Sequence, residues 1–446
     1  MMLSGKWRRN EKHHEQKAAR IIKLEFLINY KVMRKVLFLK KELVNHWGIQ
    51  IFRSLRNHDF RWFIGSALIG SVGYWILLTA QGWLVLQLTD SAFWVGMIAF
   101  ILGIPALFLS PLGGSYADRF NRRKLLLIQL AASVFLIFLL ATLVSTDVIA
   151  IWHIAVIFAL IGSLLAFTEP SYMAIIPNLV KPNDLMNAIA MENLSWFLSR
   201  FIGPAIAGIL LGLVAMGGTF YGAGAAFMVA FVLLLPMRSP ATVKTKHASI
   251  VENMKEGLRY IWNNKTALML MLMVASVSLF ATPYFRLMSV FARDVLGVGE
   301  VGYGQLMMAV GGGGLAGAII VMKMGNFKRK GWLLIGCALT FIVSLILFAL
   351  SRVLHFSLVL AFISGITSGI YMAVATMLLL SVVTDQFRGR VMGLFSMTWQ
   401  LPAVGSLMLG AVTDWIGLTV AIIAFALICT IIILGVFLRL PSLLEL

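Results

Sequence analysis

The chain has little charge and almost no cysteine. Lysine, arginine, aspartate and glutamate make up 12% of its 446 residues, whereas charged residues are roughly a quarter of a soluble protein. This shortage excludes a water-soluble fold. Cys337 and Cys429 lie inside apolar runs, so they indicate small packing residues and no disulfide framework. His13 and His14 have no second ligand pair at metal spacing, and no metal site is predicted.

Long apolar runs take the place of charge. Hydrophobic residues make up 60% of the chain, and runs of about 20 apolar residues recur after residue 60. Each run can satisfy its own backbone in lipid only as a helix, and the runs lack the alternation of a membrane β-barrel. The sequence therefore predicts an all-α integral membrane protein with twelve transmembrane helices. They are expected at 62–88, 92–116, 125–145, 149–170, 185–213, 216–236, 266–292, 302–322, 332–351, 356–383, 391–412 and 418–438.

The basic residues are distributed unevenly between the two sides. With the amino terminus inside, 33 of the 37 lysines and arginines fall in inner segments, and only Arg293 and Arg352 fall in outer loops. Because cytoplasmic loops retain lysine and arginine, both termini are predicted to be cytoplasmic. The net charge of +19 is therefore mostly a signal of topology, and nucleic-acid binding is not predicted.

Polar interruptions divide the chain into four regions. The basic tail suits the anionic inner leaflet, or is an over-long start without transport chemistry. The longest interruption within the membrane region leaves six apolar runs on each side, and its stretch SIVENMKEGLRYI has apolar residues at helical spacing. This spacing predicts a surface helix on the inner leaflet. The regions are the tail (1–58), an N-terminal six-helix half (59–236), a cytoplasmic linker (237–265) and a C-terminal six-helix half (266–446).

Four charged residues fall inside predicted membrane helices: Glu169, Glu192, Arg200 and Arg286. A charge in lipid is costly, so each is a functional candidate. Glu192, Trp196 and Arg200 follow one another at intervals of four, which places them on one helix face. A carboxylate kept from water can exchange protons near neutral pH, so these residues are predicted to couple transport to protons. The alternative is a structural buried ion pair.

Polar and aromatic side chains within the helices are candidates for lining a substrate cavity between two halves. Packing and anchoring at the interface are the alternative roles of such aromatics. The candidates are Tyr74, Gln81, Trp83, Trp196, Tyr284, Trp399 and Gln400.

Residues 114–124, GSYADRFNRRK, form a charged island between two apolar runs. The island resembles the major facilitator superfamily signature Gly-x-x-x-Asp-Arg-x-Gly-Arg-Arg/Lys between helices 2 and 3, and the layout of six and six helices is also similar to that superfamily. The matching residues are Gly114, Asp118, Arg119, Arg122 and Arg123. Asn121 replaces a glycine, and asparagine also accepts a left-handed backbone.

This resemblance implies the major facilitator fold and transport by alternating access. In the superfamily the aspartate, here Asp118, pairs with the facing half and holds the cytoplasmic side shut. A carboxylate beside guanidinium groups can form charge-assisted bonds that break when the halves rock apart. Arg388 or Arg390 is the expected partner in the other half.

A second resemblance covers residues 167–208, FTEPSYMAIIPNLVKPNDLMNAIAMENLSWFLSRFIGPAIAG. This stretch is similar to bacterial exporters of siderophores, macrolides and multiple drugs. Ser199, Gly203, Pro204 and Gly208 also approximate the Gly-x-x-x-Gly-Pro-x-x-Gly-Gly pattern of proton-coupled antiporters. A mid-helix proline with small neighbours lets a helix bend and another helix approach. Tyr172 stands where many proton-coupled drug antiporters carry an arginine.

Together these features predict a secondary active exporter of small amphipathic organic molecules in the bacterial inner membrane, working by alternating access and coupled to protons. Siderophore export is a related alternative. A membrane-embedded transferase is an alternative of a different class, but no Ser-His-Asp constellation, metal spacing or nucleotide-binding motif is present. The expected partners are a small-molecule substrate, protons and the lipid bilayer. We expect a monomer without a cofactor.

Overall fold

The computed structural model describes residues 53–238, 250–324, 327 and 329–439, without the side chains of residues 111–119, 250, 251 and 253. Two compact units can be distinguished, Met1–Arg56 and Asn57–Leu446. In the first unit the described residues form one 3₁₀ turn, η1 (Arg53–Arg56). The membrane helices all belong to the second unit.

The first group of helices contains the predicted N-terminal half. Its members are α2 (His58–Thr89), α3 (Ala92–Arg119), α4 (Arg122–Ser145), α5 (Ile151–Leu179), α6 (Leu185–Leu213) and α7 (Ala215–Leu234). A short 3₁₀ turn, η2 (Pro182–Asp184), precedes α6. Within this group α2 packs against α6 and α7, and α3 packs against α5.

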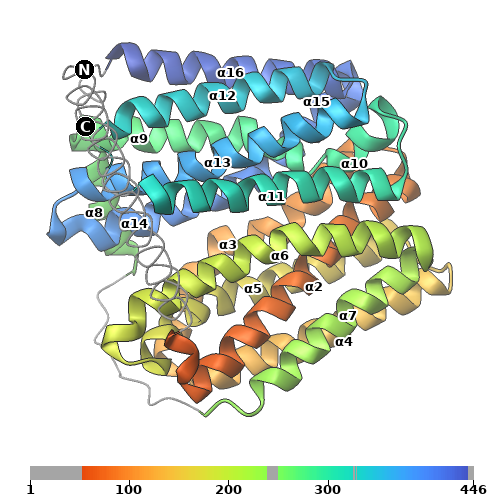
Figure 1. The fold of residues 1–446 in the computed structure, drawn as a ribbon, viewed down its shortest axis with the longest axis horizontal. Helices are drawn as coiled ribbons and strands as arrows, with labels where there is room; N and C mark the ends of the chain where they lie inside the picture. Colours follow the sequence, from red (N-terminus) through yellow and green to blue (C-terminus); the bar gives the residue numbers. More distant parts are fainter. Residues whose placement is uncertain (1–52, 239–249, 325–326, 328, 440–446) are drawn as a thin grey trace, which may run out of the picture. The chain divides into compact units, whose positions relative to one another are not determined.

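The second group follows α8 (Ile250–Asn263), a helix within the predicted linker. Its helices are α9 (Lys265–Ser276), α10 (Met288–Val290), α11 (Glu300–Met324), α12 (Lys330–Leu350), α13 (Leu354–Val382), α14 (Asp385–Met397), α15 (Leu401–Ile416) and α16 (Leu418–Arg439). Here α13 lies between α11 and α12, and α16 packs against α12. Figure 1 shows the two groups one above the other, with α6 and α11 on their facing sides.

Among the described residues, eleven segments are long and apolar enough to cross a membrane. The remaining predicted segment, 391–412, is divided between α14, the 3₁₀ turn η6 (Thr398–Gln400) and α15, which has 16 residues. The all-helical membrane fold is therefore confirmed, and the count of twelve stays a prediction.

Two of the expected helices differ in form. The helix predicted to end at residue 170 continues to Leu179 with Pro170 and Pro177 inside it, because tertiary packing can hold a proline-containing helix together. The helix predicted at 266–292 is broken by π turns η3 (Val277–Ala281) and η5 (Phe291–Val295) and by the 3₁₀ turn η4 (Thr282–Phe285). Pro283, which has no N–H to donate, lies at the start of η4.

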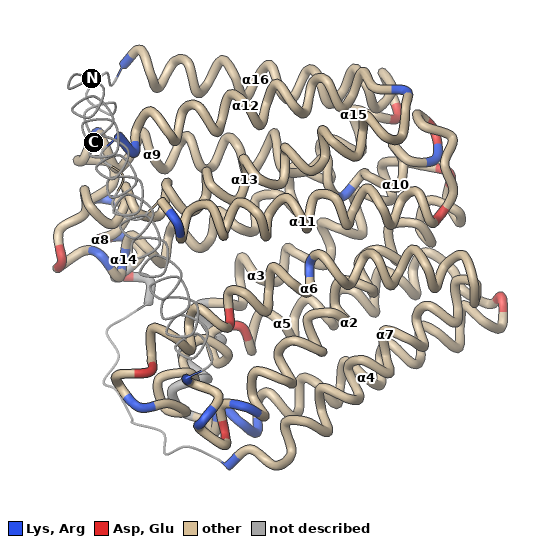
Figure 2. Tube along the Cα trace, in the orientation of Figure 1, with Lys and Arg blue, Asp and Glu red and all other residues tan. Residues whose placement is uncertain are grey.

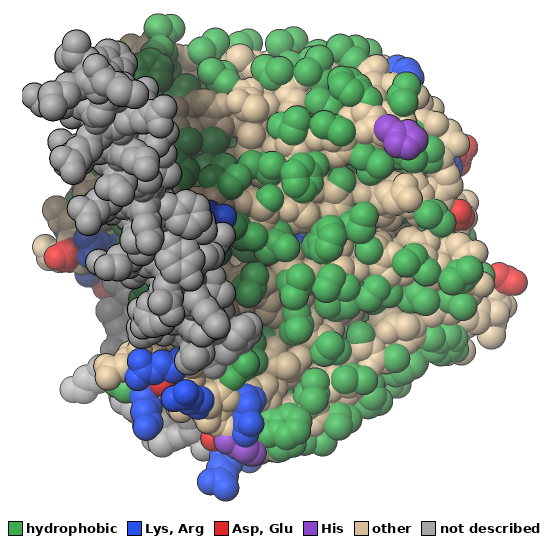
Figure 3. Space-filling model, viewed as in Figure 1, with side chains coloured by type: hydrophobic (Ala, Val, Ile, Leu, Met, Phe, Trp, Pro, Cys, Tyr) green, Lys and Arg blue, Asp and Glu red, His purple; other side chains and the backbone are tan. Residues whose placement is uncertain are grey.

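The two ends of the helix bundle differ in charge (Figure 2). Most lysines and arginines gather at the end that holds the links from α3 to α4, from α5 to α6 and from α13 to α14, which we call the basic end. The opposite end, which we call the acidic end, carries Asp90, Asp147, Asp294 and Asp414. Between the ends, hydrophobic side chains cover much of the face shown in Figure 3, as expected for a surface in contact with lipid.

The groups are joined by two helix pairs, α6 with α11 and α3 with α15. Small residues allow the close approach: a Cβ added to Gly304 would lie 2.6 Å from the Gly208 Cα atom. A Cβ on Gly96 would overlap the carbonyl oxygen of Ser406 on α15. Toward the basic end α6 and α11 diverge (Figure 1). The groups are therefore sealed together from the acidic end to the middle of the bundle.

Candidate transport site

The charged island at the basic end is only partly described. Gly114, Asp118 and Arg119 lie among the residues whose side chains are outside the description, so the predicted contact of Asp118 with the other half stays a prediction. Asn121 has φ −65° and is the N-cap of α4, where its side chain accepts a hydrogen bond from the Lys124 N–H. An N-cap needs an extended backbone and a side-chain acceptor, so Asn121 does not use the left-handed backbone that asparagine also accepts.

Four arginines of the predicted gate have described bonds at the basic end. The Nη1 atom of Arg122 donates to the Ala174 carbonyl at 2.6 Å, and Nη2 of Arg123 donates to the Leu235 carbonyl at 2.6 Å. In the second group Arg388 pairs with Asp385 at 2.7 Å. Arg390 pairs with Glu256 of α8 at 2.6 Å. These bonds connect helix ends within the first group and connect α14 to α8.

At the acidic end, Arg293 connects the two groups. Its Nη2 atom donates to Asp90, at the C-terminus of α2, and its Nη1 atom donates to the Leu86 carbonyl at 3.3 Å. Its Nε atom donates to the neighbouring Asp294 at 2.6 Å. The sequence analysis placed Arg293 in an outer loop and gave it no role. No sequence signal connected it to Asp90, which is 203 residues away.

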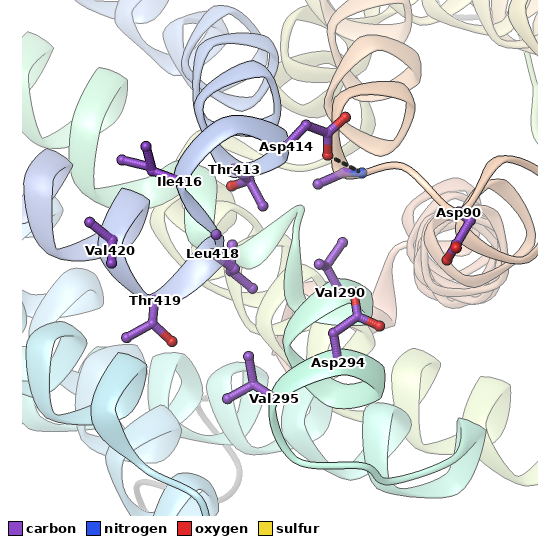
Figure 4. A pocket seen from close by; sticks show the side chains of 12 residues that line it. Asp90, Val290, Asp294, Val295, Thr413, Asp414, Ile416, Leu418, Thr419 and Val420 are labelled. Carbon is purple, nitrogen blue, oxygen red and sulfur yellow. Dashed lines mark hydrogen bonds between the residues drawn. The ribbon is translucent and has the colours of Figure 1, made fainter.

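Asp414 makes the second connection at this end. One of its carboxylate oxygens accepts the Ala92 N–H at 2.9 Å, and the other accepts the Ser91 hydroxyl at 2.7 Å. Asp414 thus caps the N-terminus of α3 from another helix, where a negative charge is favourable. A pocket of about 330 Å³ lies beside this contact, lined by carboxylates and by apolar residues such as Val290 and Leu418 (Figure 4).

A cluster of aromatic rings and one arginine lies deeper, between the groups. Trp196 of α6 stacks on Tyr74, with ring centroids 6.3 Å apart, and contacts Trp75 at 5.6 Å. Phe285 of the second group meets Trp75 edge to face at 5.9 Å. The Arg200 guanidinium lies 5.4 Å from the Trp75 ring and 4.9 Å from the Phe285 ring. We call Tyr74, Trp75, Trp196, Arg200 and Phe285 the arginine–aromatic cluster.

Arg200 has no carboxylate partner within the described part of the chain. It forms no salt bridge, and its Nε atom is buried without a hydrogen-bond partner. Two cation–π contacts contribute roughly 1–4 kcal/mol when desolvated, while an arginine at the membrane centre costs at least about 2.5–3.5 kcal/mol. The rings can offset the cost of Arg200. They do not neutralise its charge.

Arg286 follows Phe285 and lies within electrostatic range of Arg200 and of the Tyr74 side chain. It also forms no salt bridge with a described residue, and no aromatic ring covers it. It lines a small pocket of about 10 Å³ together with Gln81 and Tyr303, room for about one water molecule. Two positive charges that repel each other therefore meet where the groups join.

The two glutamates lie on the first group, toward the basic end from Arg200. Glu169 of α5 is exposed and Glu192 of α6 is half-buried, and they are within electrostatic range of each other. Glu192 lies two helical turns from Arg200, about 12 Å along the axis, and no salt bridge joins the two. The alternative of a Glu192–Arg200 ion pair is thus not formed in this conformation.

The other candidates for lining the substrate cavity lie apart from one another. Gln81 is buried in the small pocket beside Arg286. Trp83 donates to Glu300 at 3.1 Å, and the Tyr284 hydroxyl is hydrogen-bonded to Ser364 at 2.6 Å. Trp399 and Gln400 belong to η6, and Trp399 is exposed. Trp75 and Phe285 were not among the candidates, because only the packing of separate helices places them against Arg200.

The helix-5 motif lies where α6 meets both α2 and α11. The Ser199 hydroxyl donates to the Leu68 carbonyl of α2 at 3.1 Å. A Cβ on Gly203 would lie 2.5 Å from the Trp75 Cβ atom. Gly208 contacts Gly304 of α11, and Pro204 lies between these positions inside the continuous helix. The predicted role of this motif in bending and sealing stays a prediction.

Comparison with known proteins agrees with this architecture. The chain is 26% identical over 382 residues to the staphyloferrin A transporter of Staphylococcus aureus, covering 83% of this chain and 94% of that protein. It is 25% identical over 405 residues to the multidrug efflux pump Tap of Mycobacterium tuberculosis, covering 85% and 93%.

Solved structures are similar in fold. A bacterial homologue of the human lysosomal transporter Spinster, in an inward-facing and unoccupied conformation, has a TM-score of 0.69 at 15% identity over 87% of this chain and 98% of that one. The nucleoside transporter NupG has a TM-score of 0.68 at 14% identity over 85% and 98%. Residues 49–445 match the family MFS_3, described as transmembrane secretion effector. The chain therefore belongs to this family of the major facilitator superfamily and is a multi-pass membrane transporter.

Proposed function

We propose that the protein is a secondary active exporter of small amphipathic organic molecules in the bacterial inner membrane. The arginine–aromatic cluster carries this proposal. It combines apolar rings with an unpaired charge, and its residues come from both groups of helices. A molecule bound there would contact both groups, so its binding could bias how they rock against each other. The name of the relative Tap, a multidrug efflux pump, supports export of drug-like molecules.

The arrangement of the contacts supports alternating access. The groups are sealed at the acidic end by Asp90–Arg293, by Asp414 on α3 and by the Gly208–Gly304 approach. Assigning the basic end to the cytoplasm makes this conformation closed to the outside. The opposite state needs these contacts to break and a seal to form at the basic end, where Asp118 is the proposed element. Both chain termini are then cytoplasmic.

Proton antiport is the proposed energy source. Glu169 and Glu192 are close enough to repel when both are ionised, so proton uptake and release at this pair can depend on which side of the membrane supplies water. The pair lies on the same group as Arg200, which links proton movement to the cluster. We propose that a single chain carries out this exchange without modifying its substrate.

Siderophore export remains the alternative, supported by the name of the staphyloferrin A transporter. An efflux assay separates the two. Cells that lack their own exporters would be loaded with a panel of amphipathic dyes and antibiotics, with and without a proton uncoupler. Uncoupler-sensitive efflux of several unrelated compounds is expected. Efflux of none of them, together with secretion of an iron chelator, would favour the alternative.

A further inference from the structure

The charges around the arginine–aromatic cluster are unbalanced. Arg200 and Arg286 lie within electrostatic range of each other, and neither forms a salt bridge with a described residue. The two carboxylates that belong to the same region, Glu169 and Glu192, are set toward the basic end. Buried charges in proteins are normally paired, and like charges close together in a membrane are unfavourable. The two arginines therefore lack a carboxylate partner among the described residues.

We propose that Arg200 and Arg286 bind the carboxylate of the transported molecule, and that its substrates are amphipathic organic anions. The inference rests on the proposed export function and specifies its substrate class. Guanidinium groups match the planar carboxylate with paired hydrogen bonds. The buried Nε atom of Arg200, which has no partner, supplies a donor at the cluster.

The neighbouring rings select the remainder of the substrate. Trp196 and Tyr74 stack at one side of the cluster, and Trp75 and Phe285 hold the guanidinium. Trp196 lies four residues before Arg200 on α6 and is 37% exposed, so part of its surface is free for contact. An aromatic or aliphatic body would pack on this surface while its carboxylate reaches Arg200. Molecules with a carboxylate but no apolar body would lose this contact.

The binding of the anion would also connect the two helix groups. Arg200 belongs to α6, whereas Arg286 follows η4 in the second group. Bound together, the carboxylate and the two arginines would add a charged bridge across the interface to the existing contact of Arg200 with Phe285. A neutral molecule of the same shape could occupy the rings but could not make this bridge.

Binding of a matched pair of fluorescent probes tests the inference. Pyrenebutyric acid and pyrenebutanamide have the same ring and nearly the same shape, and only the first carries a carboxylate at pH 7.5. The full chain would be reconstituted in nanodiscs, and energy transfer from tryptophan to pyrene would report binding, with empty nanodiscs as the blank. We expect the acid to bind at least about tenfold more tightly than the amide.

Three variants test whether the preference for the acid depends on these two arginines. Arg200→Gln and Arg286→Gln should each reduce the preference to about twofold or less while affinity for the amide changes little, and Arg200→Lys should keep part of it. Arg352→Gln is the matched control, because Arg352 is exposed at the acidic end and donates only to the Ala349 and Ser351 carbonyls. It should leave the preference unchanged. Retained helicity by circular dichroism would show that each variant is folded.

The outcomes separate this inference from the function itself. Equal binding of the two probes by the wild type, equal loss of both in Arg200→Gln, or no binding of either would overturn the anion site. Efflux of neutral or cationic dyes by the wild type would still support the export function in those cases. Preference for the acid without any dye efflux would instead support the anion site and count against multidrug export.

Discussion

At the scale of single residues, the function of this transporter depends on which charges the membrane interior leaves unpaired. Glu192 and Arg200 share a helix, and an ion pair between them would explain both. The structure gives Arg200 two aromatic rings from other elements instead. Glu192 is left with Glu169 as its charged neighbour. We propose that the two residues have separable roles, Glu192 in proton exchange and Arg200 in substrate binding.

This separation makes a prediction for Glu192→Gln, which removes the exchangeable proton. Efflux against a concentration gradient should fall to background, while binding and downhill exchange remain. Thermal stability should be nearly unchanged, because Glu192 has no salt bridge to break. Uphill transport into proteoliposomes, downhill exchange and thermal unfolding would be compared with Glu252→Gln, a glutamate of α8 that lies exposed outside the membrane. Full uphill transport by Glu192→Gln would eliminate its role as proton carrier.

At the scale of helices, close approach of backbones decides where the groups meet. Gly208 and Gly304 bring α6 and α11 together near the acidic end. Such contacts are a common way for membrane helices to pack, because lipid offers little hydrophobic force between helices. A side chain at either position would have to displace backbone.

We predict that Gly208→Ala loosens this seal. The added methyl carbon would lie 2.9 Å from the Gly304 Cα atom, and overpacking of this kind typically costs about 1–3 kcal/mol. Lower thermal stability and reduced efflux are expected. Gly336→Ala is the matched control, since a Cβ there meets nothing within 4 Å. Equal thermal stability of Gly208→Ala and Gly336→Ala would show that α6 and α11 can move apart at Gly208 without loss of stability.

The basic end offers a second test, on the contact between α8 and α14. Tyr260 stacks on Phe387 with centroids 4.6 Å apart, and its hydroxyl oxygen accepts the Thr384 N–H at 3.2 Å. This bond lowers the pKa of Tyr260, because a phenolate is the better acceptor. Since the folded pKa lies below the unfolded value, the resulting stability should appear as the pH rises through the folded pKa and be fully present above the unfolded one.

Tyr260→Phe should therefore weaken the docking of α8 on α14 by about 0.5–1.5 kcal/mol. It should also remove the increase in docking stability expected for the wild type in alkaline solution. Hydrogen exchange of α8 between neutral and alkaline pH, corrected for the intrinsic exchange rate, would measure both effects. Trp262→Phe is a suitable control because Trp262 is an exposed ring of the same helix. Unchanged hydrogen exchange of α8 in Tyr260→Phe would mean that ring stacking alone holds α8 against α14.

At the scale of the whole molecule, alternating access requires that the seal between the two groups forms at one end when it breaks at the other. The acidic end is held by polar contacts between residues with substantial exposure: the Arg293 side chain is 31% exposed and that of Asp90 82%. Exposed ion pairs contribute only about 0.2–1 kcal/mol. Contacts of this strength can hold a conformation without trapping the protein in it.

Removing the Arg293 contact should open the acidic end more often. In a background with Cys337 and Cys429 replaced by alanine, Met307→Cys would place a thiol in the small pocket beside Arg286. Arg293→Gln should speed the reaction of this thiol with an impermeant maleimide, added from the acidic side, by about two- to fivefold. This is the factor that the loss of an ion pair worth about 1 kcal/mol or less allows. Arg352→Gln should not speed it. Identical rates would remove Arg293 from the seal.

The orientation of the molecule is tested independently of transport. Lysine and arginine gather at the basic end (Figure 2), so this end is predicted to face the cytoplasm. A reporter fused after Arg123 should be cytoplasmic, and one fused at Asp147, in the turn between α4 and α5, should be external. Reversal of the two would overturn the direction of transport proposed here.

The amino-acid sequence by itself determined that this is a helical membrane protein and where most of its helices lie. An apolar run in lipid must satisfy its own backbone, so 185–213 and 418–438 predicted α6 and α16 to within a residue. The same local rules found the intramembrane charges, since a charged residue within an apolar run can be recognised from that run alone. They failed where packing against neighbouring helices decides the form of a segment: at Pro170 and Pro177 within α5 and at the broken segment around Pro283.

Only the tertiary structure decided which of these residues meet. Periodicity assigns Glu192, Trp196 and Arg200 to one helix face but does not name the element that covers it. The rings of Trp75 and Phe285 reach Arg200 from separate helices, and Asp414 caps α3 across 322 residues of chain. Such contacts arise from the packing of helices that are each stable on their own in lipid. For that reason the arginine–aromatic cluster and the acidic-end seal belong to the fold rather than to any single segment.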